Sequence, residues 1–492
     1  MRAPAQPATR LHPHAGWAAA AGALGLAAGW TASRWGDLFR VEAASPLLLL
    51  ALVAGGIAVG LLAARPSVAL VLVVAFVYLH LSEVLVREHA LPSFLRLLFV
   101  PLAGAALLAA GREGLARLAL QPVPWAVAAW LAAGMLAARR AVDPALAQAD
   151  LVELGRGLLL LVTVALLSAH PRRLRLALGA TVAAGTLLAA GALLQVGTDF
   201  AVGDLGGLAR IKHAQIYGNV FEPRVAGPLG DPNFFAQVLL PLVPLALAMA
   251  REGTRLVPRL LALLAGAILV GGIVVTYSRG AVVALAVVAA LMPFAMRLRK
   301  RQVVAIGALL IAPMLLLPGL PSRLSTLRQV LPGGGDVLRP DSSFEKRRLV
   351  TRTAWEMFLE HPALGVGPGN YAARFAELAP RVGSRAREYD EPGEPQYPHN
   401  LFLEVAAETG IVGLLAFAAV AVTLFGSAAR AAARFRGRGE ERASRLVAAL
   451  AVGLVGYFTC SVFLHGHFQR YLWLLAGLVV ACDLVARRPE DA

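Results

Sequence analysis

One stretch near the C-terminus places ionisable side chains at the start of an apolar helix of membrane length. It reads YPHNLFLEVAAETG and covers residues 397–410. Asn400, Glu404 and Glu408 recur at helical spacing within it, so they form one polar stripe. A carboxylate that faces lipid at this depth costs roughly 2.5–3.5 kcal/mol. We therefore expect the stripe to face neighbouring helices or water, and to hold its helix against them or support a site from behind.

His399 lies just before this stripe, at the expected outer edge of the membrane. An unperturbed histidine has a pKa of about 6.5 and suits general-base chemistry. Taken alone, His399 is better explained as a capping or interfacial residue. Two arginines elsewhere in the chain favour the catalytic interpretation.

Arg224 and Arg279 both lie at expected outer ends of helices. Arg224 occurs in FEPRVAGPLGDPNFFAQ (221–237), where Asp231 is a candidate helix N-cap. Arg279 occurs in the short break of VVTYSRGAVVAL (274–285). Because a guanidinium group can bind phosphate oxygens through paired N–H donors, one base and two such groups predict a transferase with a phosphate leaving group.

Other polar residues are weaker candidates. His465 and His467 lie in HGHFQR (465–470), but two histidines without a third ligand at fixed spacing do not define a metal site. We expect no metal and no cofactor, and an interfacial role or substrate contact for these histidines. Arg348 precedes an amphipathic segment and is either a solvated helix start or a substrate contact. Asn400 and Glu404 are further candidates for substrate contact.

The composition fixes the kind of chain that carries these residues. Of 492 residues, 58% are hydrophobic and only 15% are charged, whereas a soluble domain has about 25% charged residues. The formal net charge is +16, which in a soluble protein would suggest nucleic acid. In a membrane protein, Lys and Arg gather in cytoplasmic loops instead, so we expect membrane lipids and no nucleic acid as partners.

Apolar runs of spanning length recur along the whole chain. We predict an all-α polytopic membrane bundle of about 14 (12–14) transmembrane helices, with a large extracytoplasmic loop carrying short helices. The expected spans are 16–33, 46–64, 67–86, 93–111, 118–138, 151–169, 175–197, 233–250, 260–277, 280–296, 303–319, 399–424, 446–464 and 471–487.

Basic clusters set the expected orientation. RLRKR (297–301) and the arginine-rich segment 430–445 should be cytoplasmic. Counting outward from them puts both termini inside and leaves Arg139 and Arg140 outside, against the rule. Four regions follow from this model: N-terminal helices (1–197), central helices with the arginine motifs (198–319), a large outer loop (320–397) and C-terminal helices (398–492).

Four motifs, in order, resemble the signature segments of the O-antigen ligase and O-antigen polymerase superfamily. They are RVAGPLGDPNFFA, TYSRGAVVAL, HPALGVGPGNY and PHNLFLEVAAETGIVG, between about Arg224 and Gly413. The resemblance implies an inverting, metal-independent glycosyltransferase of the bacterial inner membrane. Its active site would face the periplasm, and the loop 320–397 would be periplasmic. Ligases commonly have about twelve spans, fewer than the pattern predicts here.

The resemblance also implies substrates and residue roles. The donor would be a glycan on undecaprenyl diphosphate, and the acceptor a second lipid-linked unit or lipid A–core. His399 would be the base toward the acceptor hydroxyl, and Arg224 and Arg279 would bind the diphosphate. The motifs do not separate a ligase from a polymerase or a protein glycosyltransferase.

Two other classes of function remain to be weighed. A multi-spanning transporter or flippase for lipid-linked oligosaccharide also has many helices and buried carboxylates. Such a protein places its polar groups near the membrane midplane, whereas Arg224, Arg279 and His399 lie at one face. A scaffold for polysaccharide assembly would leave these three residues dispensable.

Overall fold

The computed structural model describes residues 46–217, 220–304, 307–308, 342–383, 396–466 and 470–488. The expected first span at 16–33, most of the span at 303–319 and much of the segment 320–397 lie outside these residues. The described part is almost entirely helical, in agreement with the predicted class. One two-stranded sheet departs from the all-α expectation.

The first half consists of helices that mostly start at a proline, whose fixed φ suits the first helical turn. They are α2 (Pro46–Ala64), α3 (Pro66–Tyr78), α4 (Leu81–His89), α5 (Phe94–Ala119), α6 (Pro122–Ala137), the 3₁₀ turn η1 (Ala138–Arg140), α7 (Pro144–Leu167) and α8 (Pro171–Gly197). The expected single span 67–86 is wrong: it divides into α3 and α4 because His80 has a left-handed φ of 55°. Helix α5 is longer than expected and is interrupted at Gly111.

The second half begins with an antiparallel hairpin and continues with helices. These elements are β1 (Arg210–Tyr217), β2 (Val220–Gly227), α9 (Pro232–Leu239), α10 (Leu242–Glu252), α11 (Leu256–Val274), α12 (Arg279–Ala295), α15 (Ser342–Glu360), α16 (Tyr371–Val382), α17 (Leu401–Gly437), α18 (Glu441–Ser461) and α19 (Arg470–Ala486). Helices α9 and α10 together make one apolar stretch of 21 residues.

Six helices of the described ranges are long and apolar enough to cross a membrane, or seven if the pair around Pro66, bent by 111°, counts as one span. The described residues thus indicate a multi-pass membrane protein, and the expected count of about 14 stays a prediction. Helices α6, α12 and α19 have only 16, 17 and 17 residues. Helix α7 is longer but carries Asp150, Glu153 and Arg156.

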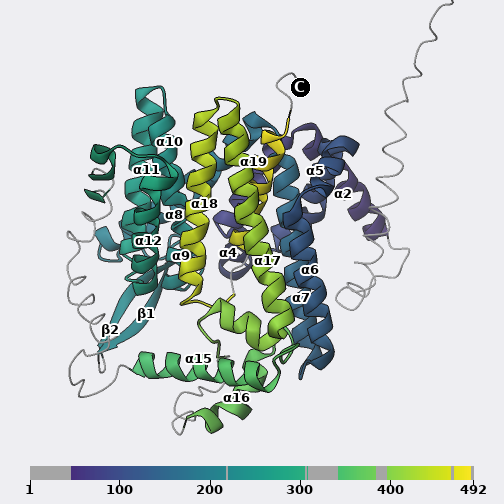
Figure 1. Ribbon diagram of the computed structural model, residues 1–492, viewed down its shortest axis with the longest axis vertical. Helices are drawn as coiled ribbons and strands as arrows, with labels where there is room; N and C mark the ends of the chain where they lie inside the picture. The colour runs from purple at the N-terminus through teal and green to yellow at the C-terminus, as the bar shows by residue number, and fades with distance from the viewer. Residues whose placement is uncertain are drawn as a thin grey trace, which may run out of the picture.

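The bundle has two different ends (Figure 1). Helices α15 and α16 and the hairpin lie at one end, which we call the α15 end, and the last residues of α19 lie at the other. Helix α15 is the amphipathic helix predicted from its sequence. Val350, Ala354 and Met357 are buried on its inner face, while Phe358 is half-buried.

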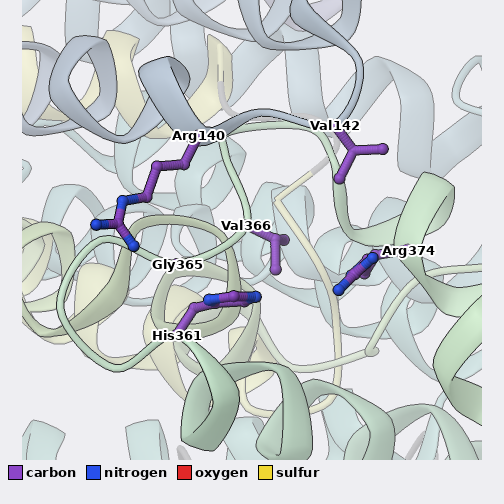
Figure 2. Close-up of a pocket in the computed structure, with 6 residues that line it drawn as sticks. All are labelled: Arg140, Val142, His361, Gly365, Val366 and Arg374. Carbon is purple, nitrogen blue, oxygen red and sulfur yellow. The ribbon is translucent and has the colours of Figure 1, made fainter.

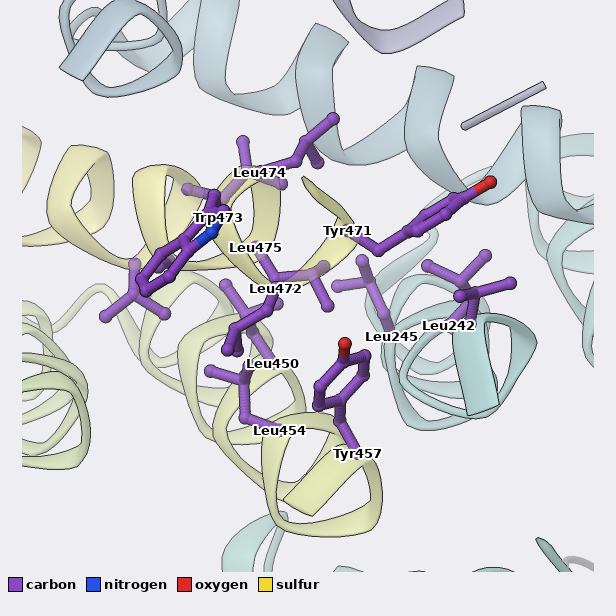
Figure 3. Close-up of a cluster of buried hydrophobic side chains, with 14 of the residues drawn as sticks. Leu242, Leu245, Leu450, Leu454, Tyr457, Tyr471, Leu472, Trp473, Leu474 and Leu475 are labelled. Atoms are coloured by element: carbon purple, nitrogen blue, oxygen red, sulfur yellow. The ribbon is translucent and has the colours of Figure 1, made fainter. Parts of the chain in front are cut away.

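Helix α19 runs through the centre of the bundle, and its residues from Tyr471 to Ala486 are all buried. Figure 3 shows its first turn packed among leucines of α10 and α18. Small residues allow close approach, which drives helix association in membranes. A Cβ added at Gly453 of α18 would lie 2.5 Å from the Pro241 carbonyl oxygen. Backbone contact at this point therefore requires glycine.

Ion pairs join the helices at the opposite end. Arg445 of α18 donates from Nε and Nη2 to the two carboxylate oxygens of Glu252, at 2.6 and 3.0 Å. Asp483 of α19 is fully buried between Arg434 of α17 and Arg487. Part of the basic cluster 430–445 thus binds acids of the protein itself.

Candidate active site

The hairpin and α9 form one wall of the α15 end. Lys212 of β1 is paired with Arg224 of β2 across the hairpin. The Lys212 ammonium lies 3.1 Å from the Asp231 carboxylate, which also accepts from the amides of Asn233 and Phe234. Asp231 is therefore the N-cap that the sequence predicts. Burial alone would raise the pKa of Asp231, but Lys212 and these two N–H donors hold it below its ordinary value.

Arg224 connects the hairpin to the turn between α11 and α12. Its Nε and Nη2 donate to the Thr276 carbonyl oxygen at 3.0 and 2.7 Å. This turn contains Tyr277 with a left-handed φ of 53°, and Ser278 caps α12 by accepting from Ala281. Arg279 is the first residue of α12 and is exposed. The two predicted arginines are thus brought to the same turn, one through a backbone contact.

His399 lies in the loop before α17 with a left-handed φ of 49°. Its ring centre is 5.5 Å from that of His465. The His465 ring stacks on Tyr397 at 4.2 Å and meets Phe234 of α9 edge-on at 5.0 Å. The connection between α18 and α19 is therefore packed between His399 and the wall formed by α9.

Charged groups surround His399 and change its titration. Burial lowers the pKa of His399 to about 4, and the cations Arg347, Lys346 and Lys212 act in the same direction, against Asp231. A buried imidazolium loses hydration and is repelled by these cations, so the neutral ring is favoured. His399 is therefore unprotonated near pH 7, which is the form a base needs.

The same connection also contacts the start of α12. A Cβ added at Gly280 would lie 3.0 Å from the Phe463 ring, so the residue after Arg279 packs directly on the segment that carries His465. The three predicted residues are therefore connected indirectly. Arg224 contacts the backbone of Thr276, the neighbour of Arg279 packs on Phe463, and His399 lies beside His465.

The polar stripe of α17 makes structural contacts. Asn400 caps the helix by accepting from the amides of Phe402 and Leu403. Glu404 accepts from the Gly466 amide at 2.6 Å and thereby holds the residue next to His465. Glu408 accepts from the amides of Gly369 and Tyr371, at 2.9 and 3.1 Å, through its two oxygens. This agrees with the expectation that the stripe holds its helix against neighbouring segments, and support of a site from behind stays a prediction.

Residues 361–371 form a backbone clasp on α17, which we call the clasp. Helix α17 is interrupted at Gly410, whose φ of 63° favours glycine. Val366 donates to the Ala407 carbonyl, and Ile411 donates to that of Pro362 at 2.8 Å. A Cβ at Gly365 would lie 2.3 Å from the Glu408 carbonyl carbon. The glycine-rich motif is thus required for a backbone contact between α17 and the α15–α16 connection.

Several residues fall outside these contacts or outside the predictions. Arg348 is exposed on α15, and His467 lies outside the described residues. Glu83 of α4 is not among the predicted residues, and it pairs with Arg470 at the start of α19. A lone glutamate in an apolar run was the available signal. Within the described ranges, there is no group of three or more His, Cys, Asp or Glu side chains that could hold a metal ion.

The fold and the site define a class: a multi-span membrane protein with basic groups and a neutral histidine gathered at one end of the bundle. Residues 264–418 match the family described as O-antigen ligase. The match confirms, for this segment, the resemblance seen in the motifs. It includes Arg279, the clasp and His399, whereas Arg224 precedes it.

The search of curated proteins found no match to this chain. The family match indicates glycan transfer of the ligase or polymerase type, acting on lipid-linked glycans in a membrane. It gives no support to the transporter or flippase alternative.

Proposed function

We propose that this protein transfers a glycan from undecaprenyl diphosphate to an acceptor hydroxyl at the periplasmic face of the bacterial inner membrane. The observation that carries the proposal is the Arg224 contact to the Thr276 carbonyl. This contact brings the Arg224 guanidinium to the turn that precedes Arg279. The start of α12 packs on the connection between α18 and α19, and this connection also packs against His399.

In the proposed reaction, His399 accepts the proton of the acceptor hydroxyl. The hydroxyl oxygen attacks the anomeric carbon of the donor from the face opposite the diphosphate, so the configuration inverts. The bond between that carbon and the diphosphate oxygen breaks, and its electron pair leaves with undecaprenyl diphosphate. Charge grows on this leaving group, and cationic donors placed where charge develops are often the largest single contribution to catalysis.

The two arginines take different parts in this scheme. Arg279 is exposed at the first turn of α12, so we assign it direct contact with the diphosphate. Arg224 uses two of its donors on the backbone of the same turn. We therefore assign Arg224 both to holding that turn and to adding positive charge beside it.

The environment of His399 fits the proposal in both states. In the free protein burial, and then the neighbouring cations, keep the pKa of His399 low. A diphosphate bound beside Arg347, Lys346 and Lys212 would offset their repulsion, and the pKa of His399 would rise toward the range of an effective base. Donor binding would thus strengthen the base that the acceptor meets.

Replacing His399 by alanine tests the proposal. The purified protein, reconstituted in liposomes with a lipid-diphosphate-linked glycan and candidate acceptors, is assayed for new glycoconjugate. We expect His399→Ala to lose at least about a hundredfold in rate, the typical size of a general-base contribution. The control is His89→Ala, which removes an exposed histidine of α4 and should transfer at the wild-type rate. Wild-type transfer by His399→Ala would refute the base assignment.

The product of the wild-type reaction distinguishes the subtypes. Growth of a ladder of repeat units means a polymerase, whereas a single transfer to a lipid core means a ligase. A glycosylated polypeptide as the product means a protein glycosyltransferase.

A further inference from the structure

A second group of basic side chains lines a cavity at the α15 end, where the clasp meets the connection between α6 and α7. The cavity has a volume of about 180 Å³ and is lined by Arg140, Val142, His361, Gly365, Val366 and Arg374. Figure 2 shows the three basic side chains arranged around this space. One water needs only about 10–15 Å³, so the cavity admits a polyatomic group.

Backbone contacts fix the two halves of this cavity to each other. Asn370 of the clasp donates to the Asp143 carbonyl at 3.1 Å and accepts from the Asp143 amide at 2.7 Å. A Cβ added at Gly367 would lie 2.7 Å from the Ala141 Cα, directly after Arg140. The backbone segments that carry the lining residues are therefore fixed relative to each other before any ligand arrives, which lowers the entropic cost of binding.

The charge of the cavity is positive. Within the described part of the chain, the side chains of Arg140 and His361 make no hydrogen bond or ion pair. Arg374 pairs with Glu377. The Glu377 side chain is 52% exposed and is shared with Arg381, 3.7 Å away. Two arginines from different elements thus line one cavity, and the guanidinium group of arginine suits the binding of phosphate oxygens.

The rest of the lining is apolar. Val142 and Val366 present methyl groups, which suit the carbon skeleton attached to a phosphate better than a free ion. The cavity also accounts for an exception in the sequence: Arg140 lies on the expected outer side, where basic residues are depleted. A binding role would account for an arginine at this position.

We propose that this cavity binds a phosphate ester carried by the acceptor saccharide, at a point separate from His399. That the phosphate ester belongs to the acceptor rests on the proposed function, whereas the phosphate-ester site itself rests on the cavity alone. A phosphate ester at the membrane surface could also belong to an anionic lipid headgroup, and the experiment separates these two sources.

The probe is glucose 6-phosphate, with glucose as the uncharged control, measured by isothermal titration calorimetry on the purified full-length protein. We expect saturable binding of glucose 6-phosphate and none of glucose. Arg140→Gln combined with Arg374→Gln should weaken binding at least tenfold. The matched control combines Arg139→Gln with Arg381→Gln, which removes two exposed arginines from the same elements outside the cavity, and it should bind like wild type.

Two further measurements keep the inference separable from the proposed function. The contrast between the double variants should persist in an Arg279→Gln background, because the cavity shares no residue with the proposed donor site. Absence of saturable binding to wild type, or equal losses in both double variants, would overturn the site. Binding seen in phosphatidylcholine nanodiscs but abolished in phosphatidylglycerol nanodiscs would overturn the acceptor source in favour of a headgroup. None of these outcomes depends on His399 or on turnover.

Discussion

Burial and three neighbouring cations give His399 a titration unlike that of a surface histidine. The ring is neutral through the physiological range because its pKa lies at about 4, lowered by burial and then by Arg347, Lys346 and Lys212. A base with this pKa is weak in the free protein, but it is always ready to accept a proton. The cations that weaken it are also those that would attract an anionic donor.

The pH dependence of transfer follows from the sign of this shift. A histidine whose pKa is lowered stays a base until the pH falls through about 4, so kcat/KM for the donor, which reports the donor-free protein, should be flat from pH 7 to pH 5 and fall below that. Arg347→Gln removes a repelling cation and should move the acid limb upward by roughly half a pH unit, because exposed charges are screened. Any titration of the donor diphosphate itself is common to all variants, so it does not affect the difference between their acid limbs. Arg352→Gln, an exposed change on the same helix, should leave the limb in place, and a wild-type limb near pH 6.5 would contradict the assignment.

At the scale of elements, the clasp links α15 and α16 to the first turns of α17. The link combines backbone pairing on both sides of Gly410 with the two bonds that Glu408 accepts. The clasp helps to hold α15, whose Lys346 and Arg347 act on His399, and Thr351 of α15 also donates to the Pro398 carbonyl at 3.3 Å. The clasp therefore supports the electrostatics of the site without contacting it.

Glu408→Ala tests the clasp. It removes the acceptor of two N–H groups in a buried region, and each donor left unsatisfied costs about 1–3 kcal/mol. We expect a lower free energy of unfolding, measured by denaturant titration in micelles, and faster hydrogen exchange at the Gly369 and Tyr371 amides. The control Glu356→Ala changes an exposed residue of α15 and should alter neither. Unchanged exchange at these two amides would show that Glu408 does not hold the clasp.

Some elements were predictable from sequence and others were not. The α15 helix, the N-cap at Asp231 and the polar stripe of α17 all follow from spacing, because side-chain periodicity and capping are local signals. The clasp and the Arg224 contact to Thr276 join distant segments through backbone groups. A glycine-rich motif signals a close approach, but it does not identify the backbone that is approached. The hairpin had a local signal, because Gly218-Asn219 between two β-prone runs is typical of a turn. The all-α prediction did not take this signal into account.

At the scale of the whole molecule, the two ends are stabilised differently. The α15 end gathers like charges around His399 and around the cavity at Arg140, which is unfavourable without an anion. At the opposite end, ion pairs join different helices, with Arg445 on Glu252 and two arginines on buried Asp483. Other arginines of this end gather around His170, so its charges are only partly paired. The stability of the bundle should therefore depend on the opposite end and its activity on the α15 end.

A double-mutant cycle on Glu252 and Arg445 tests this division. The pair is bidentate and its side chains are only 10% and 20% exposed, so we expect a coupling energy of about 1–3 kcal/mol in unfolding titrations, as for charge-assisted bonds. The matched cycle uses Glu153 and Arg156, each 52% exposed at 3.2 Å, and should give at most about 0.5 kcal/mol because exposed pairs contribute little. Folded protein with Glu252→Gln and Arg445→Gln should still transfer glycan at the wild-type rate, since neither residue lies at the α15 end. Equal couplings in the two cycles would contradict the stabilising role of the Glu252–Arg445 pair. Lost transfer by folded protein would show that the two ends are not independent.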